Sequence, residues 1–247
     1  TIRTRVPTML ERSGDFSQSR DARGPVALVD PRTGLPIPNN AIPADRMSPQ
    51  ALALLAFYPT PNVADAEATN YQTAITDRTV RDALQMRVNQ SLTTRQQVSG
   101  SVSYQHARTT STSLFQFADR ARSTDVDATV TWSYRASPTK TWRAHYELIG
   151  ALADAQPFFA GRVNVSGDAG ITGNDQAPWS WGPPTLSFAS GLAGLTSASP
   201  VSQRAMTHVA GGDGTWLHGY HNVSYGAEWR ARHIDSTSQT DPRGTFT

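Results

Sequence analysis

The chain contains no cysteine among its 247 residues, and it has no long apolar stretch. The absence of cysteine excludes a disulfide scaffold and any metal site built on thiolates. A membrane-spanning helix needs about 20 consecutive apolar residues. The longest apolar run, residues 51–58, is much shorter and has a proline near each end. No transmembrane helix is therefore expected.

The chain also lacks a strong surplus of charge. It has 22 basic and 20 acidic residues, interspersed along the sequence, and a net charge of +2. Because no basic stripe appears, we expect no nucleic-acid partner. The mean hydropathy of −0.44 is typical of a soluble protein. Membrane strands are half polar, however, so this value does not exclude a membrane protein built from strands.

The sequence does contain stretches in which apolar and polar residues alternate. They form three pairs, which we predict to be β-hairpins: 82–106, 124–151 and 206–233. In residues 221–233 one set of alternating positions is almost entirely apolar, and it includes Tyr225 and Trp229. Side chains on a strand alternate between faces, so each hairpin has one apolar and one polar face. Segment 206–217 is expected to be the weakest strand because it is rich in glycine.

The connections between these segments differ greatly in length. About three residues join the two strands of each pair, whereas about 17 residues follow position 106 and a long loop spans 152–205. Short turns at one end and long loops at the other are typical of outer-membrane barrels. We predict an all-β fold: an incomplete, antiparallel, up-and-down transmembrane β-barrel segment of about six to seven strands. A last strand is expected to begin at residues 244–247.

Residues 1–81 form a separate, proline-rich extracellular loop region in this prediction, and 82–247 form the strand region with its long loop. One short helix is expected near 49–57. Ser48 is a suitable N-cap, Pro49 fits the first helical position, and Pro59 ends the helix.

A soluble alternative stays open. Aromatic residues fall on the apolar positions of the strands, where they fit either a lipid interface or the core of a β-sandwich. These residues are Tyr104, Trp132, Tyr134, Trp142, Tyr146, Trp216, Tyr225 and Trp229. The alternative function is that of a soluble all-β adhesion or carbohydrate-binding domain at the cell surface.

No pattern predicts catalysis or a bound cofactor, and we do not expect an enzyme. Gly211-Gly212-Asp213-Gly214 lacks the phosphate-loop spacing and is better explained as a flexible or bulged strand. His218 and His221 flank a turn without a third metal ligand.

Asp168, Asn174 and Asp175 offer oxygen ligands but not the EF-hand spacing, so no metal site is predicted. The ligand-binding residues stay unknown.

Two further groups are candidates for contact with a ligand. Charged residues on the polar positions would face the lumen of a barrel, or would simply form a hydrated face: Arg87, Arg143, His145, Glu147, Glu228, Arg230 and Arg232. In the loop 152–205, four aromatic residues could stack on a glycan or pack the loop against itself. They are Phe158, Phe159, Trp179 and Trp181.

Several ordered motifs resemble the Oar-like TonB-dependent outer-membrane receptors. The first is the stretch from Val6-Pro7-Thr8 through Glu11-Arg12 to Gly14-Asp15-Phe16-Ser17. The others follow in the family's order: Asp30-Pro31-Arg32-Thr33-Gly34, Ile42-Pro43, Arg46-Met47-Ser48-Pro49, Leu54-Leu55-Ala56-Phe57-Tyr58-Pro59-Thr60-Pro61-Asn62, Asn70-Tyr71, Tyr225-Gly226-Ala227-Glu228-Trp229-Arg230 and Arg243-Gly244-Thr245-Phe246.

The resemblance implies a barrel of about 22 strands with a separate plug domain. It also implies a TonB-type energy-coupling partner, location in the cell outer membrane with contact to its lipid, and import of a bulky ligand such as a glycan. No plug, energy-coupling box or terminal barrel strand is recognisable in these residues. We therefore expect an internal piece of a longer protein that does not fold stably alone.

Overall fold

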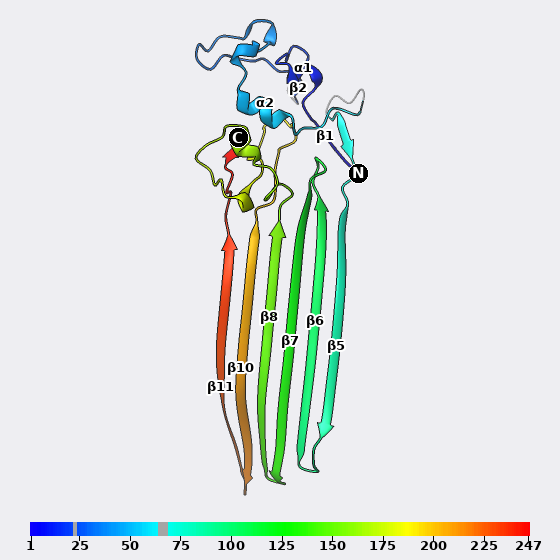
Figure 1. Ribbon diagram of the computed structural model, residues 1–247, viewed down its shortest axis with the longest axis vertical. Helices are drawn as coiled ribbons and strands as arrows, with labels where there is room; N and C mark the ends of the chain where they lie inside the picture. Colours follow the sequence, from blue (N-terminus) through cyan, green and yellow to red (C-terminus); the bar gives the residue numbers. More distant parts are fainter. Residues whose placement is uncertain (22–23, 64–68) are drawn as a thin grey trace.

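The computed structural model describes residues 1–21, 24–63 and 69–247. Its main feature is one antiparallel sheet of six long strands in the order β11-β10-β8-β7-β6-β5 (Figure 1). The strands are β5 (Asp77–Ser91), β6 (Gln96–Thr112), β7 (Ala118–Ser137), β8 (Lys140–Gln156), β10 (Val201–His218) and β11 (His221–Ser238). Consecutive long strands are neighbours throughout, so the predicted up-and-down arrangement is confirmed.

The two ends of the sheet differ as predicted. Short turns at 92–95, 138–139 and 219–220 lie at one end, and Gly219 provides the positive φ of +59° in the last of them. The long connections and both termini lie at the other end, which we call the cap end (Figure 1). On outer-membrane barrels the long loops are extracellular.

The strands are longer than predicted at the cap end. The prediction of a loop of about 17 residues after position 106 is wrong, because β6 and β7 stay paired up to Thr112 and Ala118. Only residues 113–117 connect them. The alternation of apolar and polar residues ends before the strands do, which is why their upper parts were missed. The long loop is likewise shorter, covering 157–200 instead of 152–205.

The glycine-rich segment 206–217, expected to be the weakest strand, lies within a strand that has no interruption. β10 is a continuous strand of 18 residues that pairs with β8 on one side and β11 on the other. Its glycines make room for rings on neighbouring strands. A Cβ atom at Gly214 would lie 2.6 Å from both Trp142 Cδ1 and Tyr225 Cζ. Ladder hydrogen bonds on both sides compensate for the missing side chains.

The remaining elements are short and lie at the cap end. They comprise β1 (Ile2–Thr4), α1 (Met9–Arg12), β2 (Arg20–Asp21), β3 (Gly24–Pro25), η1 (Pro38–Asn40), η2 (Ala44–Arg46), α2 (Pro49–Leu55), β4 (Tyr71–Thr73), α3 (Val165–Asp168), η3 (Pro178–Ser180), β9 (Thr185–Leu186) and β12 (Thr245–Phe246). The predicted helix is α2, and Ser48 caps it by accepting from Ala51 N. No helix among the described residues is long and apolar enough to cross a membrane.

The predicted last barrel strand is wrong. β12 pairs in parallel with β9 within the cap, and it does not join the six-stranded sheet. The sequence 244–247 has the alternation of a strand, but a neighbouring loop segment provides its partner.

The two faces of the sheet carry the predicted sets of side chains. Because the register is continuous, one row across the sheet joins Val88, Gly100, Val130, Tyr146, Ala210 and Trp229. The adjacent row, on the opposite face, joins Arg87, Ser101, Thr129, Glu147, Val209 and Arg230. We call these the apolar face and the polar face.

No second sheet covers the apolar face in the described part of the chain. Trp132, Trp142 and Trp229 are 36%, 39% and 60% exposed, and they are not enclosed in a core. The structure therefore does not have the two packed layers of the soluble sandwich alternative.

Aromatic rings gather on the apolar face near the short turns. Trp132 stacks on Tyr134 at 5.8 Å, and Trp142 donates a hydrogen bond of 2.6 Å to the Tyr225 hydroxyl. Lys140 lies 5.0 Å from the centre of the Trp216 ring. Amphipathic rings in this position suit the level of the lipid headgroups.

A matched pair of substitutions tests which face meets lipid. Val130→Arg places a charge in the middle of the apolar face and should destabilise the protein in lipid vesicles by about 2–4 kcal/mol. Thr129→Arg places the same charge on the opposite face and should have little effect. Equilibrium unfolding of the intact protein in urea measures both, and equal losses would contradict the assignment of the faces.

Candidate functional site: the loop cap and the faces of the sheet

The loops at the cap end form one folded unit with its own hydrophobic core. This unit, which we call the cap, consists of the described residues within 1–76, 113–117, 157–200 and 239–247. Its core contains Val6, Leu54, Tyr58, Tyr71, Phe115, Phe159, Val165, Ala169, Ala193 and Leu195. These residues come from three separate segments of the chain, 1–76, 113–117 and 157–200. The surface at the cap end is therefore a packed structure and not a set of independent loops.

Arg12 holds two parts of the cap together. Its guanidinium donates to the carbonyl oxygens of Leu55, Tyr58 and Pro59, at 3.2, 2.8 and 2.6 Å. These carbonyls lie at the C-terminal end of α2 and just beyond it, where helix carbonyls lack partners within the helix. The Glu11-Arg12 motif is thus fixed to the Tyr58-Pro59 motif, although the two are far apart in the sequence.

Glu11 connects α1 to its surroundings. Its carboxylate accepts from Thr8 N and Ser19 Oγ and forms an ion pair of 2.7 Å with Arg5. Thr8 in turn accepts from Glu11 N, which completes a capping box. Burial raises the pKa of the Glu11 carboxyl, but the hydrogen bonds from Ser19 and Thr8 and the charge of Arg5 together lower it below its ordinary value.

Other motif residues are also structural. Asn70 pairs with both backbone groups of Val6, donating to its oxygen and accepting from its nitrogen at 2.8 Å each. Phe16, of the first motif, is held through its carbonyl oxygen, which accepts from the side chain of Asn40. The residues that carry the family resemblance in 1–81 therefore specify the shape of the cap.

Arg243 attaches the segment after β11 to the long loop. It is only 4% exposed, and it donates to the carbonyl oxygens of Ser180, Ser197 and Ala198. The Arg243-Gly244-Thr245-Phe246 motif is therefore part of the cap.

The four candidate aromatic residues divide into two pairs. Phe158 stacks on Phe117 at 5.6 Å, and Phe159 is 2% exposed in the core, so both pack the loop against the rest of the cap. Trp181 donates its ring N–H to the Gln176 carbonyl. Trp179 lies beside an open hollow between the long loop and the sheet.

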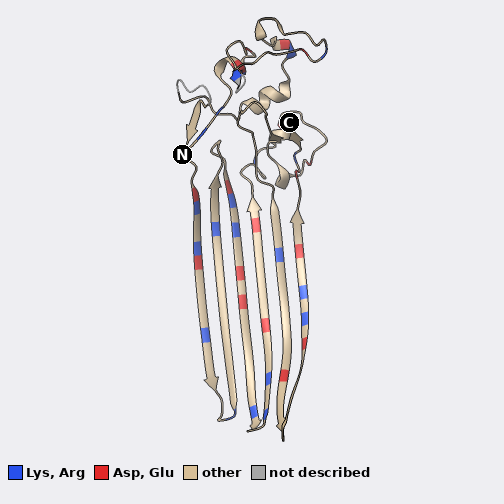
Figure 2. Ribbon diagram, turned by 180° about the vertical axis from the view of Figure 1, so that it is seen from behind, with Lys and Arg blue, Asp and Glu red and all other residues tan. Residues whose placement is uncertain are grey.

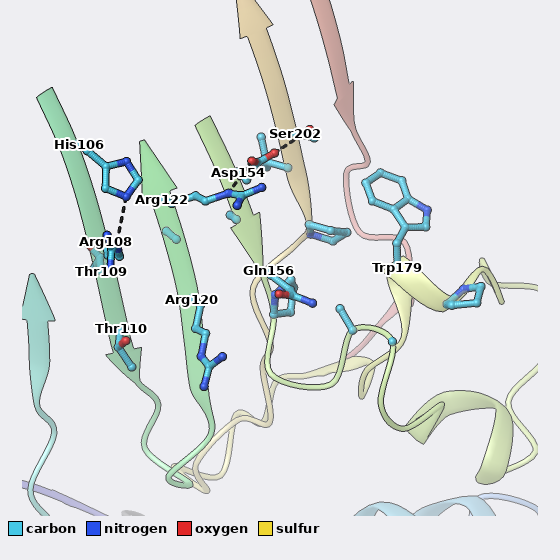
Figure 3. A pocket seen from close by; sticks show the side chains of 18 residues that line it. His106, Arg108, Thr109, Thr110, Arg120, Arg122, Asp154, Gln156, Trp179 and Ser202 are labelled. Carbon is cyan, nitrogen blue, oxygen red and sulfur yellow. Dashed lines mark hydrogen bonds and ion pairs between the residues drawn. The ribbon is translucent and has the colours of Figure 1, made fainter. Parts of the chain in front are cut away.

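This hollow has a volume of about 1150 Å³. Its sheet side carries polar and charged residues of β6, β7, β8 and β10, and Figure 3 shows Trp179 on its loop side. The sequence prediction did not identify it, because 107–123 and 152–156 were expected to be loops. The apolar positions of the lower strands do not continue through these upper segments, which mix alanine with charged and polar residues, so the alternation signal does not reveal the hollow.

The other candidate groups have structural positions. His218 and His221 face each other across the last short turn. Asp175 accepts from Ala177 N and Ser180 Oγ, at 2.9 and 2.6 Å, and these hydrogen bonds, the Ser180 bond foremost, lower the pKa of its carboxyl. Within the described residues, no group of three or more His, Asp or Glu side chains is placed to hold a metal ion.

The charged residues of the polar face partly pair with each other. Arg143 contacts Asp213 at 2.8 Å, and Arg230 contacts Glu228 at 3.1 Å. Figure 2 shows charges of both signs spread along the strands. This face can remain hydrated while the opposite face meets lipid, which is the requirement for a strand that crosses a membrane next to an aqueous lumen.

Comparison with protein families agrees with this geometry. The family model described as "Outer membrane beta barrel domain" matches residues 1–247. The chain belongs to this family. It is thus an outer-membrane protein, and lipid contact through its apolar face is consistent with this family. No curated protein matches the chain.

The Glu11 site makes the stability of the cap depend on pH. A carboxyl with a lowered pKa in the folded state stabilises the fold above its unfolded pKa, and this contribution is lost as the pH falls through the folded value. The ordinary value is 4.5. We expect the cap to have its full stability at pH 7 and to become less stable as the pH falls below 4.5.

Glu11→Gln should cost the cap about 1–3 kcal/mol at pH 7, because it removes a buried charge partner and an acceptor. It should also remove this part of the pH dependence. Hydrogen exchange of peptides covering 1–15 and 54–60 in the intact protein measures both effects. The control is Asp45→Asn, which changes an exposed carboxylate of the cap. An unchanged exchange rate in Glu11→Gln would contradict the role of Glu11.

Proposed function

We propose that the protein is a TonB-dependent receptor that binds a bulky ligand at its extracellular cap and imports it through a plugged barrel. The observation that carries the proposal is the cap itself. Three segments that are distant in sequence pack into one hydrophobic core above the sheet. A shaped, folded surface at the extracellular end fits selective capture better than it fits general diffusion.

A larger barrel belongs to this proposal. β5 and β11 each have one edge without a strand partner among the described residues. Unpaired edges are not stable in lipid, where backbone groups need partners. We propose that further strands close the barrel, in line with the resemblance to receptors of about 22 strands. A separate plug domain would then meet the polar face.

The proposed role is capture and transport without catalysis. Ligand movement would depend on energy supplied by a TonB-type protein of the inner membrane. Trp179 borders the open hollow, which lies on the same side of the sheet as the apolar face, so Trp179 is not placed to stack on a ligand in the lumen. Phe159 is buried and is excluded from that role.

A growth experiment tests the proposal. One strain lacks this protein, and a second lacks the energy-coupling protein of the inner membrane. Both grow on a panel of single nutrient sources that includes glycans, peptides and chelated iron, with a small diffusible sugar as the control. We expect both strains to lose growth on the same bulky nutrient, because capture and energy supply serve one import step.

Complementation separates the cap from the barrel. The unaltered protein should restore growth, whereas Leu195→Asp, which places a charge in the core of the cap, should not. Extraction of the outer membrane checks that the variant is still inserted. A growth defect in the strain that lacks this protein, without the same defect in the strain that lacks the energy-coupling protein, would contradict the proposal.

A further inference from the structure

Two arginines stand directly opposite each other on β6 and β7. The register pairs Arg108 with Arg122. Both point to the same side as Tyr104 and Val126, which are their neighbours four positions nearer the short turns. Like charges directly opposite each other destabilise an antiparallel pair. Arg120, two positions further along β7, adds a third guanidinium to the same face.

The nearby carboxylates do not balance this charge. Asp154 on β8 contacts Arg122 Nε at 2.9 Å, and it also accepts from Ser202. Arg122 stays 63% exposed despite this contact. On the other side, Arg108 Nε donates to His106 Nε2 at 2.9 Å, so the direct partner of Arg108 is not a carboxylate.

The remaining carboxylates on this face have other neighbours. Asp82 on β5 stands opposite His106, and Asp235 on β11 stands opposite Arg204. The three arginines of the β6–β7 hairpin therefore share one close carboxylate, and the excess positive charge is local to this hairpin.

The distance of the arginines from the apolar rows indicates their depth relative to the bilayer. Tyr104 and Val126 belong to the uppermost apolar row, together with Leu84 and Met206. Four residues separate this row from Arg108 and Arg122, which is about 13 Å along a strand. On a strand tilted by about 45° this is about 9 Å along the membrane normal, which places the arginine backbone above the hydrocarbon and lets the long side chains reach the headgroups.

The arginines also line the open hollow described above. Figure 3 shows Arg108, Arg120 and Arg122 on the strand side, and Trp179 on the loop side. The long loop overhangs the lipid-facing side of the sheet at this point. A headgroup would therefore have space beside the strands and would be partly covered from above.

We propose that Arg108, Arg120 and Arg122 bind the phosphate groups of an outer-leaflet lipid, whose acyl chains lie on the apolar face below. The planar guanidinium matches a phosphate with two parallel hydrogen bonds. A bound phosphate would also relieve the repulsion between Arg108 and Arg122. The continuity with the apolar surface of Tyr104 and Val126 favours a lipid over free phosphate, because only a lipid uses both surfaces.

The test uses the intact protein in detergent and three probes: a bis-phosphorylated glucosamine lipid, the same lipid without phosphate, and inorganic phosphate. Binding is measured by native mass spectrometry and by titration. We expect the phosphorylated lipid to bind at least about tenfold more tightly than its dephosphorylated form, as charge-assisted contacts to two or three guanidinium groups imply.

The variant Arg108→Gln with Arg122→Gln should remove most of this preference. Arg230→Gln with Arg232→Gln, which removes two arginines from the polar face, is the matched control and should retain it. If the double variant does not fold, Arg120→Gln alone should still weaken binding severalfold.

Two outcomes would overturn the proposal. Equal binding of the two lipids, or equal loss in the control variant, would exclude a specific phosphate site on this hairpin. Complete competition by millimolar inorganic phosphate would indicate a site for free anions and contradict the assignment to a lipid.

Discussion

In the hydrocarbon of a bilayer, a backbone N–H or C=O group has no water to bind, so each must find its partner in the protein. The six long strands satisfy this requirement through antiparallel ladders from the short turns to the cap, with one register shift, between Arg135 and Ser137 of β7. Glycine-rich β10 shows how strict the requirement is. The strand keeps its full register although several of its positions have no side chain to pack.

Once the ladders are in place, the alternation of side chains separates two environments. The apolar face presents valine, leucine and aromatic side chains to lipid, and the polar face keeps arginine and glutamate in water. Above the apolar rows the strands continue, and charged residues replace the apolar ones on the same side of the sheet. The cap then completes the extracellular end, where the buried contacts of Arg12, Glu11 and Arg243 connect segments from different parts of the chain.

The sequence predicted the parts of the fold that this alternation encodes. The three hairpins, their faces and their short turns were all predictable, as was α2 from Ser48 and Pro49. The upper thirds of β6 and β7 were not, because outside the hydrocarbon neither face of a strand has to be apolar, and neighbours such as Arg108 and Thr109 do not differ in polarity. The cap was beyond prediction for another reason. Its core joins Val6, Phe115 and Leu195, and single-sequence patterns do not report such distant contacts.

The central claim is that lipid touches one face of this sheet and water the other, and spin labels measure this directly. The chain has no cysteine, so single cysteines can be introduced one by one at positions 126–134 of β7 in the intact protein and labelled. In lipid vesicles, the account predicts high accessibility to oxygen at the even positions and to a water-soluble nickel complex at the odd positions, with a period of two residues. Equal accessibility at neighbouring positions, or the reverse assignment of odd and even, would contradict it.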